Sequence, residues 1–311
     1  MLTNPMDVLK AFPVRKSGKQ KQAFRDAVQG YVKGLGYDVA IEKSSFGVNN
    51  IVIGDPENAK YLVTAHYDTP ARMFIPNLIT PCNLLTFLAY QIIASLILII
   101  PAILLGILVG VVTHNKELAV TVYMIALFAD IFLMMAGPAN PNNANDNTSG
   151  VVTVLEIARS MPELHRDKVC FVLFDLEEAG MVGSSAYRKA HKKASQNQIV
   201  LNLDCVGDGN EIIFFPGKKL KKDKAVMAAM NYVGGWFGEK QISVREKGFS
   251  VYPSDQTQFP LGVGIAAFHK AKLVGPYCGR IHTAKDTVLD ETNVNLLRAA
   301  LITLITGSGK P

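Results

Sequence analysis

The sequence of 311 residues is short of charge, and the shortage is local. Asp, Glu, Lys and Arg make up 19% of the chain, against about 25% in an average soluble domain. None of the four occurs between Met73 and Asn115. With 49% hydrophobic residues, the chain is too apolar to be disordered. The composition therefore leaves both soluble and membrane proteins open.

Cysteine is scarce too, and no export signal is present. The four cysteines, Cys82, Cys170, Cys205 and Cys278, have no Cys-x-x-Cys spacing. This pattern excludes a disulfide-stapled mini-protein and predicts free thiols in a reducing compartment. The first 20 residues contain no apolar stretch of signal-peptide length, so we expect no conventional leader.

The formal net charge is +6, and lysines concentrate in one short stretch. They are Lys218, Lys219, Lys221, Lys222 and Lys224. Such a run is typical of a solvated loop, and attraction to anionic lipid is the alternative. No aromatic interleaving or nucleic-acid motif accompanies the lysines, so we expect no nucleic-acid partner.

Two long apolar runs fill the uncharged part of the chain, at residues 84–112 and 118–136. A helix of about 20 apolar residues crosses the hydrocarbon core of a bilayer, and the polar connection 113–117 is short enough to force an antiparallel hairpin. Buried core helices are the alternative. We expect residues 74–136 to form an inserted transmembrane hairpin. A carboxylate in hydrocarbon is costly unless it is paired, so we expect Asp130 to form an ion pair, with Arg72 as a candidate partner.

The remaining sequence alternates apolar strands with amphipathic helices, which predicts an α/β fold with a mostly parallel central sheet and helices on both faces. The expected strands are 50–53, 60–65, 168–174, 199–203, 212–215 and 263–268. The expected helices are 19–35, a helix capped by Thr148 or Ser149 that ends near 161, 183–193, 225–237 and 293–305. Residues 1–73 and 137–311 would together form one catalytic domain.

Polar residues fall where these strands end, and ligands of such sheets bind beyond the carboxyl ends of the strands. The candidates after strands are His66, Asp68, Asp175, Glu177, Glu178 and Asp204, and Asp146 and His282 lie in polar loops. Two imidazoles and three carboxylates are what a pair of divalent metal ions requires when one carboxylate bridges them. The sequence thus predicts a metal site at one edge of the sheet.

The order of these motifs resembles that of the M28 family of zinc peptidases, which have the phosphorylase/hydrolase fold. The motifs are His66-Tyr-Asp68, Asn145-Asp146-Asn-Thr-Ser-Gly150, Glu177-Glu178-Ala-Gly180, Gly183-Ser-Ser-Ala-Tyr187, Asn202-Leu-Asp204, Ser254-Asp255 and Arg280-Ile-His282-Thr-Ala-Lys-Asp286-Thr287. The resemblance covers the whole chain outside the apolar insert. All five metal positions of the family are filled, whereas glutaminyl cyclases of this group use one zinc and some receptor ectodomains have lost the metals.

The resemblance implies a role for each matched residue. Two zinc ions would share Asp146, one completed by His66 and Asp204, the other by Glu178 and His282. Asp68 would hold the imidazole of His66 in the correct tautomer. Glu177 would be the general base that takes a proton from metal-bound water and hands it to the departing amine. Tyr252 is a candidate for stabilising the oxyanion, although it lies one residue away from the family's spacing.

These implications predict a membrane-anchored metallopeptidase, most simply an aminopeptidase. An amidohydrolase or carboxypeptidase acting on N-acylated or free-carboxylate substrates remains open, as does a non-enzymatic membrane receptor or scaffold. Because the hairpin separates His66 from Asp146, the chain must cross the membrane an even number of times between them. Ten extended residues after Ala136 reach at most about 35 Å, so the site must lie near the membrane surface.

The partners expected from this arrangement are a peptide substrate, hydrophobic or membrane-associated, and the lipid bilayer itself. The free thiols, the missing leader and the basic catalytic part favour an integral protein of the cell membrane with its catalytic domain in the cytoplasm. Metals other than zinc would fit the same ligands. Oligomeric state stays open.

Overall fold

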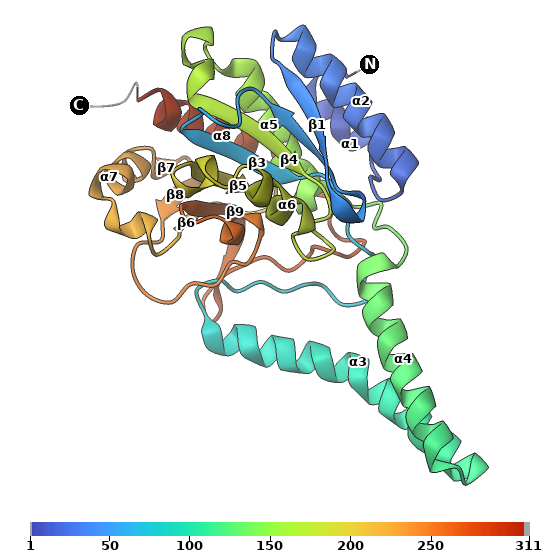
Figure 1. Ribbon diagram of the computed structural model, residues 1–311. Helices are drawn as coiled ribbons and strands as arrows, with labels where there is room; N and C mark the ends of the chain where they lie inside the picture. The colour runs from blue at the N-terminus through green and yellow to red at the C-terminus, as the bar shows by residue number, and fades with distance from the viewer. Residues whose placement is uncertain (1, 308–311) are drawn as a thin grey trace.

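A sheet of ten strands, flanked by helices, carries a long helical hairpin at one edge (Figure 1). The computed structural model describes residues 2–307. The strands are β1 (Val39–Lys43), β2 (Asn49–Ile53), β3 (Tyr61–His66), β4 (Val169–Phe174), β5 (Ile199–Leu203), β6 (Glu211–Pro216), β7 (Gly235–Phe237), β8 (Lys240–Val244), β9 (Gly262–Ala271) and β10 (Gly275–Tyr277).

The strand order is β1-β2-β4-β3-β5-β9-β6-β8-β7, with β10 paired to β9. The centre, β4-β3-β5-β9, is parallel, in the register Val63↔Phe171 and Val63↔Leu201. The β1-β2 ribbon joins β4 antiparallel, and β6 joins β9 antiparallel. The predicted mostly parallel α/β sheet is therefore confirmed at its centre. Toward the edges the pairs are antiparallel except for β6 and β8, which are parallel.

Helices flank this sheet on both faces, and two more form the hairpin. They are α1 (Val8–Ala11), α2 (Gly18–Gly34), α3 (Leu84–Thr113), α4 (Lys116–Ala136), α5 (Gly150–Ser160), α6 (Val182–Ala190), α7 (Lys224–Tyr232) and α8 (Glu291–Thr306). The prediction of a helix over 225–237 was wrong at its end, because the chain turns at Gly234 and Gly235 and continues as β7.

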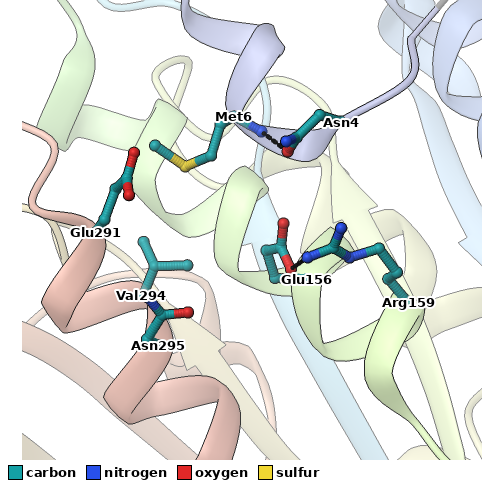
Figure 2. Close-up of a pocket in the computed structure, with 7 residues that line it drawn as sticks. All are labelled: Asn4, Met6, Glu156, Arg159, Glu291, Val294 and Asn295. Carbon is teal, nitrogen blue, oxygen red and sulfur yellow. Dashed lines mark hydrogen bonds and ion pairs between the residues drawn. The ribbon is translucent and has the colours of Figure 1, made fainter.

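A small pocket of about 220 Å³ lies between the N-terminal segment, α5 and α8 (Figure 2).

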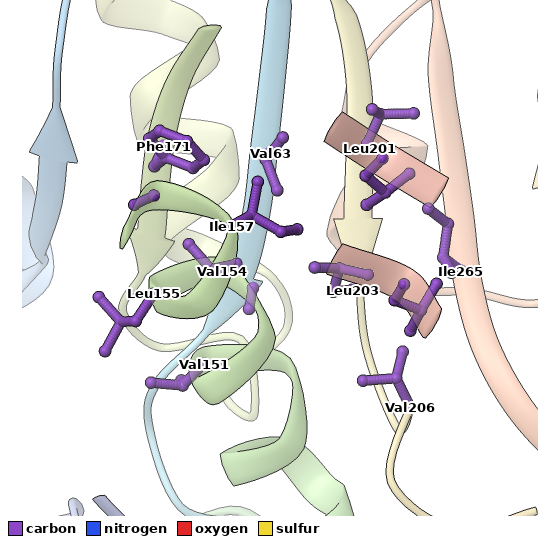
Figure 3. Packing of buried hydrophobic residues seen from close by; sticks show 14 of the residues in the cluster. Val63, Val151, Val154, Leu155, Ile157, Phe171, Leu201, Leu203, Val206 and Ile265 are labelled. Atoms are coloured by element: carbon purple, nitrogen blue, oxygen red, sulfur yellow. The ribbon is translucent and has the colours of Figure 1, made fainter. Parts of the chain in front are cut away.

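The main core lies between the sheet and the face covered by α2, α5 and α8. Successive strand residues alternate between faces, so Val63 and Phe171 point into this core, whereas Leu62 and Val172 point into a second cluster under α6. Figure 3 shows Val154 and Ile157 of α5 packed over the central strands. Each fully buried side chain of this kind stabilises the fold by about 1.5–3 kcal/mol.

The hairpin is unlike the rest of the molecule because its apolar side chains are exposed. Both helices are long and apolar enough to cross a membrane, with mean hydropathies of 3.1 for α3 and 2.2 for α4. Asn83 and Asn115 cap the two helices through their side chains, and α3 contains Pro101. In Figure 1 the first half of α3 runs beneath the sheet domain, and its second half lies along α4. The two predicted apolar helices are confirmed, each with bounds that differ by at most two residues.

Small residues let the two helices of the hairpin approach each other closely. In the hairpin helices only Ala102 and Gly106, both in α3, are buried. A Cβ atom on Gly106 would lie 2.9 Å from the Cβ of Tyr123, and one on Gly110 would lie 3.1 Å from the Cβ of Ala119. Close backbone approach through small residues is how helices associate in lipid, where apolar burial gives little driving force.

The ion pair suggested for Asp130 is not found. No ion pair within residues 2–307 joins Asp130 to Arg72 or to another cation. Arg72 lies in the linker below the sheet, where its backbone N–H donates to the carbonyl of Pro138 at 2.8 Å. This linker contact keeps Arg72 at the base of the hairpin rather than along α4.

The base of the hairpin is tied directly to the loops at the sheet edge. The two linkers pair with each other, through a bridge between Ala71 and Ala139 and a 2.9 Å bond from the Asn140 N–H to the carbonyl of Pro70. The Met73 N–H donates to the carbonyl of His282 at 2.7 Å. Both linkers therefore contact the edge of the sheet where the predicted site residues lie.

Candidate functional site

Asp146 lies at the centre of the predicted site, between two imidazoles. Its Oδ1 lies 3.3 Å from Nε2 of His66, and its Oδ2 lies 3.1 Å from Nε2 of His282. On the outer sides, Asp204 Oδ1 lies 3.7 Å from Nε2 of His66, and Glu178 Oε2 lies 3.7 Å from Nε2 of His282. One carboxylate thus faces two separate histidine–carboxylate pairs, the geometry that a bridging ligand requires.

The loop that carries Asp146 is anchored to the end of β5 by asparagines. Asn147 donates from Nδ2 to the carbonyl of Leu203, and its Oδ1 accepts the N–H of Gly150. A Cβ on Gly150 would lie 2.4 Å from the carbonyl oxygen of Leu203, so only glycine fits there. Thr148 and Ser149 do not cap α5 as predicted. The Ser149 hydroxyl instead donates to the carbonyl of Asn145 at 2.7 Å.

Asp286 fixes the backbone on which Asp146 sits. Its two carboxylate oxygens accept the N–H of Asn145 at 2.7 Å and the N–H of Asp146 at 3.0 Å. Asp286 is buried, and this burial raises its pKa to about 7. Sequence reasoning quoted Asp286 only as part of a motif. Nothing in a single sequence shows a contact that spans 140 residues.

Asp68 holds the adjacent glutamates as well as facing His66. Its Oδ1 accepts the N–H of Glu177 at 3.0 Å, and its Oδ2 accepts the N–H of Glu178 at 3.1 Å. The same Oδ1 lies 3.4 Å from Nδ1 of His66, a nitrogen that makes no hydrogen bond. Asp68 therefore positions the Glu177–Glu178 backbone more firmly than it positions the imidazole.

Three residues at this edge adopt a left-handed backbone, which L residues other than glycine seldom do. They are Leu176 with φ 55°, Cys205 with φ 56° and His282 with φ 63°. Leu176 directly precedes Glu177, and Cys205 directly follows Asp204. Strained backbone of this kind clusters at functional sites, where surrounding contacts hold it in place.

Several buried carboxyl groups lie close together in the site, and the pKa values of its residues are shifted. Burial raises the pKa of Glu178 to about 8 and that of Glu177 well above its ordinary value. Burial alone would lower the pKa of His282, but the carboxylates of Glu178 and Asp146 outweigh it and raise the value to about 9. For His66, too, the neighbouring carboxylates outweigh burial and raise the pKa. Crowding of this kind is relieved by cations.

The side chains fit divalent metal ions. His66, Asp146 and Asp204 each offer a ligand atom within 4.8 Å of the others, and Asp146, Glu178 and His282 do the same. Oε1 of Glu178 and Nδ1 of His282 are buried without a hydrogen-bond partner. Mixed imidazole and carboxylate ligands suit zinc and related ions. The five residues predicted as ligands are thus all brought together.

Tyr252 lies beside this cluster but its hydroxyl is already engaged. It donates to the backbone carbonyl of Asp204 at 2.9 Å, and the buried ring stacks on Phe215 at 5.6 Å between centroids. A hydroxyl in this position supports the end of β5. A role for Tyr252 in stabilising the oxyanion stays a prediction.

Sequence reasoning gave no role to Asp255, although its carboxyl group is fully buried. Burial raises its pKa to about 7, and its charge adds to that of Glu177 in the same site. The only signal in the sequence was its place before β9 in the Ser254-Asp255 motif. Asp255 therefore joins Asp68 and Glu177 as a carboxyl group of the site that the metal ligands do not account for.

Fold and side chains together define an α/β protein with a metal centre at the carboxyl edge of a central parallel sheet. The chain belongs to peptidase family M28, whose model matches residues 125–305. That match includes Asp146, Glu177, Glu178, Asp204 and His282. His66 and Asp68 precede it, and the structure places both beside the matched residues.

One curated relative is aminopeptidase YwaD of Bacillus subtilis, 40% identical over 73 residues. The match takes in 22% of this chain and 16% of that protein, so the chain spans only a small part of its relative's length.

Solved structures share the fold at low identity. The LapA aminopeptidase of Legionella pneumophila has a TM-score of 0.59 at 14% identity, covering 99% of this chain and 70% of its own. A glutaminyl cyclase of Macrostomum lignano also has a TM-score of 0.59, at 13% identity, covering 99% of this chain and 90% of its own. Both similarities concern the fold alone.

Proposed function

We propose that this protein is a membrane-anchored zinc peptidase that releases N-terminal residues from peptides. The observation that carries the proposal is the position of Asp146, with one carboxylate oxygen toward His66 and the other toward His282. A single-metal site would need only one of these pairs. The M28 membership supports the reaction class, and the YwaD similarity supports the aminopeptidase type.

In this proposal two zinc ions bind per chain. His66 and Asp204 hold one, Glu178 and His282 hold the other, and Asp146 bridges them. Bound zinc lowers the pKa of a coordinated water and polarises a carbonyl group. Five ligands with three negative charges match two divalent cations better than one. Other divalent metals would fit the same atoms.

Glu177 is the proposed general base. Asp68 accepts its backbone N–H, which fixes the backbone from which the Glu177 carboxylate extends beside the metal ligands. As a carboxylate, Glu177 can accept a proton from water and later pass it to the departing amine. Asp68 acts as a positioning residue, since it holds Glu177 and Glu178 and faces His66.

A free α-amine suits this site better than an N-acyl group does. Asp255 and Glu177 place two further carboxyl groups beside the metal ligands, and each adds negative charge when it is ionised. A protonated amine would offset that charge. The observation favours aminopeptidase activity over an amidohydrolase or carboxypeptidase, whose substrates lack a free amine at the cleaved end.

We further propose that residues 1–73 and 137–311 form the catalytic domain and that residues 74–136 insert into the membrane. The exposed apolar surface of α3 and α4 supports insertion. Both linkers are bonded to loops of the metal edge, which supports a site that faces the bilayer and takes hydrophobic or membrane-associated peptides. The catalytic domain lies in the cytoplasm in this proposal.

The test is to purify the full chain in detergent, quantify its metal and assay a panel of peptides. The panel pairs each aminoacyl-peptide with its N-acetylated form and with a substrate cleaved at the carboxyl end. We expect about two zinc ions per chain and hydrolysis of the free-amine peptides only. A chain that binds no metal and hydrolyses nothing would instead be a receptor or scaffold. Cleavage of N-acetylated peptides would indicate an amidohydrolase.

A further inference from the structure

A second cavity, of about 850 Å³, lies on the far side of Tyr252 from the metal ligands. One wall is the segment from Phe215 to Lys221, and the other is the segment from Gly248 to Pro253. The ring of Tyr252 is buried between the two sites, stacked on Phe215 and edge-on to Phe268. The cavity is therefore separate from the metal site.

The cavity carries positive charge without neutralising partners. Lys218, Lys219 and Lys221 line it, and none of them belongs to an ion pair within residues 2–307. The acidic residue nearest in sequence, Asp223, caps α7 by accepting the N–H groups of Ala225 and Val226 at 3.1 Å. Free ammonium groups around a concave space attract an anion.

The wall opposite the lysines is joined to the start of α3. The Val251 N–H donates to the carbonyl of Pro81 at 2.9 Å, two residues before Asn83 caps α3. In Figure 1 this loop descends from β8 toward the first turn of α3. The cavity thus lies where the chain would enter a membrane.

We infer that this cavity binds the phosphate of an anionic phospholipid headgroup. Lysines beside a membrane-entry helix attract anionic lipid, and the apolar surface of α3 begins directly beneath the loop that walls the cavity. The acyl chains would lie along α3 while the phosphate meets Lys218, Lys219 and Lys221. The inference rests on the proposed insertion of residues 74–136.

The test measures lipid binding to the full chain in detergent by native mass spectrometry, with phosphatidylglycerol or phosphatidylcholine as the probe. The wild type should retain phosphatidylglycerol about tenfold more than phosphatidylcholine, since each lysine near the surface contributes appreciably. The triple variant Lys218→Gln, Lys219→Gln, Lys221→Gln should lose that preference. A matched control, Lys189→Gln, Lys192→Gln, Lys193→Gln, removes the same charge from exposed lysines at the end of α6 and beyond and should keep the preference.

Equal loss in both triple variants, or no preference in the wild type, would overturn the inference. Glycerol 3-phosphate serves as a second probe. If it bound as tightly as the lipid, and through the same lysines, the ligand would be a free phosphate compound and the lipid assignment would be wrong.

Flotation with liposomes after alkaline extraction separates this inference from the proposed anchoring. A wild type that floats but shows no lipid preference contradicts only the headgroup site. A wild type that does not float contradicts the membrane anchor, and the headgroup site with it.

Discussion

The metal edge and the hairpin are held in place by opposite means. At the metal edge, buried hydrogen bonds hold the backbone of the ligand loops, as Asp68 and Asp286 show, each accepting two backbone N–H groups. In the hairpin almost every side chain is apolar and exposed, and only Ala102 and Gly106 are buried. Buried hydrogen bonds fix the first region, whereas lipid covers the second in the function proposed above.

The two regions nevertheless meet at the linkers. The N–H of Met73 donates to the carbonyl of His282, and Asn140 Nδ2 donates to the carbonyl of Thr283. A ligand loop of the site and the base of the hairpin therefore share hydrogen bonds. The comparison teaches that the site is built on a hydrogen-bonded scaffold to which the hairpin is directly joined. The changes below separate the contribution of that scaffold from that of the proposed membrane anchor.

Glu177→Gln should give the largest effect, because it removes the proposed general base without removing a metal ligand. We expect hydrolysis to fall by about 10²–10⁴-fold while zinc content and thermal stability stay unchanged. The measurement is kcat on a soluble aminoacyl-peptide, alongside metal analysis. Glu163→Gln, at an exposed position, is the control. A Glu177→Gln enzyme with normal turnover would show that the proposed mechanism is wrong.

Asp286→Asn should loosen the bridging carboxylate without touching a metal. The variant loses one of the two acceptors for the backbone of Asn145 and Asp146, so we expect zinc affinity to fall by about 10–100-fold. Competition against a chelator gives the affinity. Asp167→Asn, at an exposed site, should leave it unchanged. Unaltered affinity in Asp286→Asn would mean that the loop is held by its asparagines alone.

Removing zinc should expose the protonation of the ligands. The folded, metal-free protein holds protons on Glu178, with a pKa of about 8, and on His282, with a pKa of about 9. Because these values are raised above those of the unfolded chain, the stability of the zinc-free protein should fall as pH rises from 6.5 through 9. Zinc affinity should rise over the same range, since zinc displaces those protons.

Thermal unfolding with and without a chelator, followed across this pH range, measures the effect. The double variant Glu178→Gln, His282→Gln should flatten the dependence. The control pair Glu163→Gln, His165→Gln should keep it. A zinc-free wild type that becomes more stable toward pH 9 would contradict the account.

Gly106→Leu should affect the hairpin alone and by the smallest amount. A side chain there would meet Tyr123 at 2.9 Å, and overpacking of this kind costs about 1–3 kcal/mol. We expect a lower unfolding temperature in micelles and unchanged hydrolysis of short soluble peptides. Ile107→Leu, at an exposed position, is the control. Lost activity toward soluble peptides would show that the anchor and the site are more tightly coupled than proposed.

The sequence allowed prediction of the features that depend on local pattern. His66 and Asp204 end or directly follow apolar strands, so the common edge of a parallel sheet brings them together. The apolar composition of residues 84–112 and 118–136 is enough to predict two helices. Both inferences use neighbours in the chain, and both agree with the structure.

The features that escaped prediction depend on contacts between distant segments. The three-residue strands β7 and β10 exist only because β8 and β9 offer edges to pair with. Asp286 reaches the backbone of Asp146 across 140 residues. The capping prediction at Thr148 and Ser149 was wrong because a side chain one residue earlier, Asn147, reaches the N–H of Gly150.

The central claim is that the hairpin aims the metal edge at the membrane. The most direct measurement compares kcat/KM for two forms of one free-amine peptide, a soluble form and a form with a C-terminal lipid chain. Both are assayed with the full protein in liposomes and again in detergent micelles. The account predicts that the lipidated peptide is cleaved at least about tenfold faster in liposomes, where it shares the surface with the enzyme, and that the advantage is lost when the peptide and enzyme occupy separate micelles. Equal kcat/KM for the two peptides in liposomes would contradict the claim.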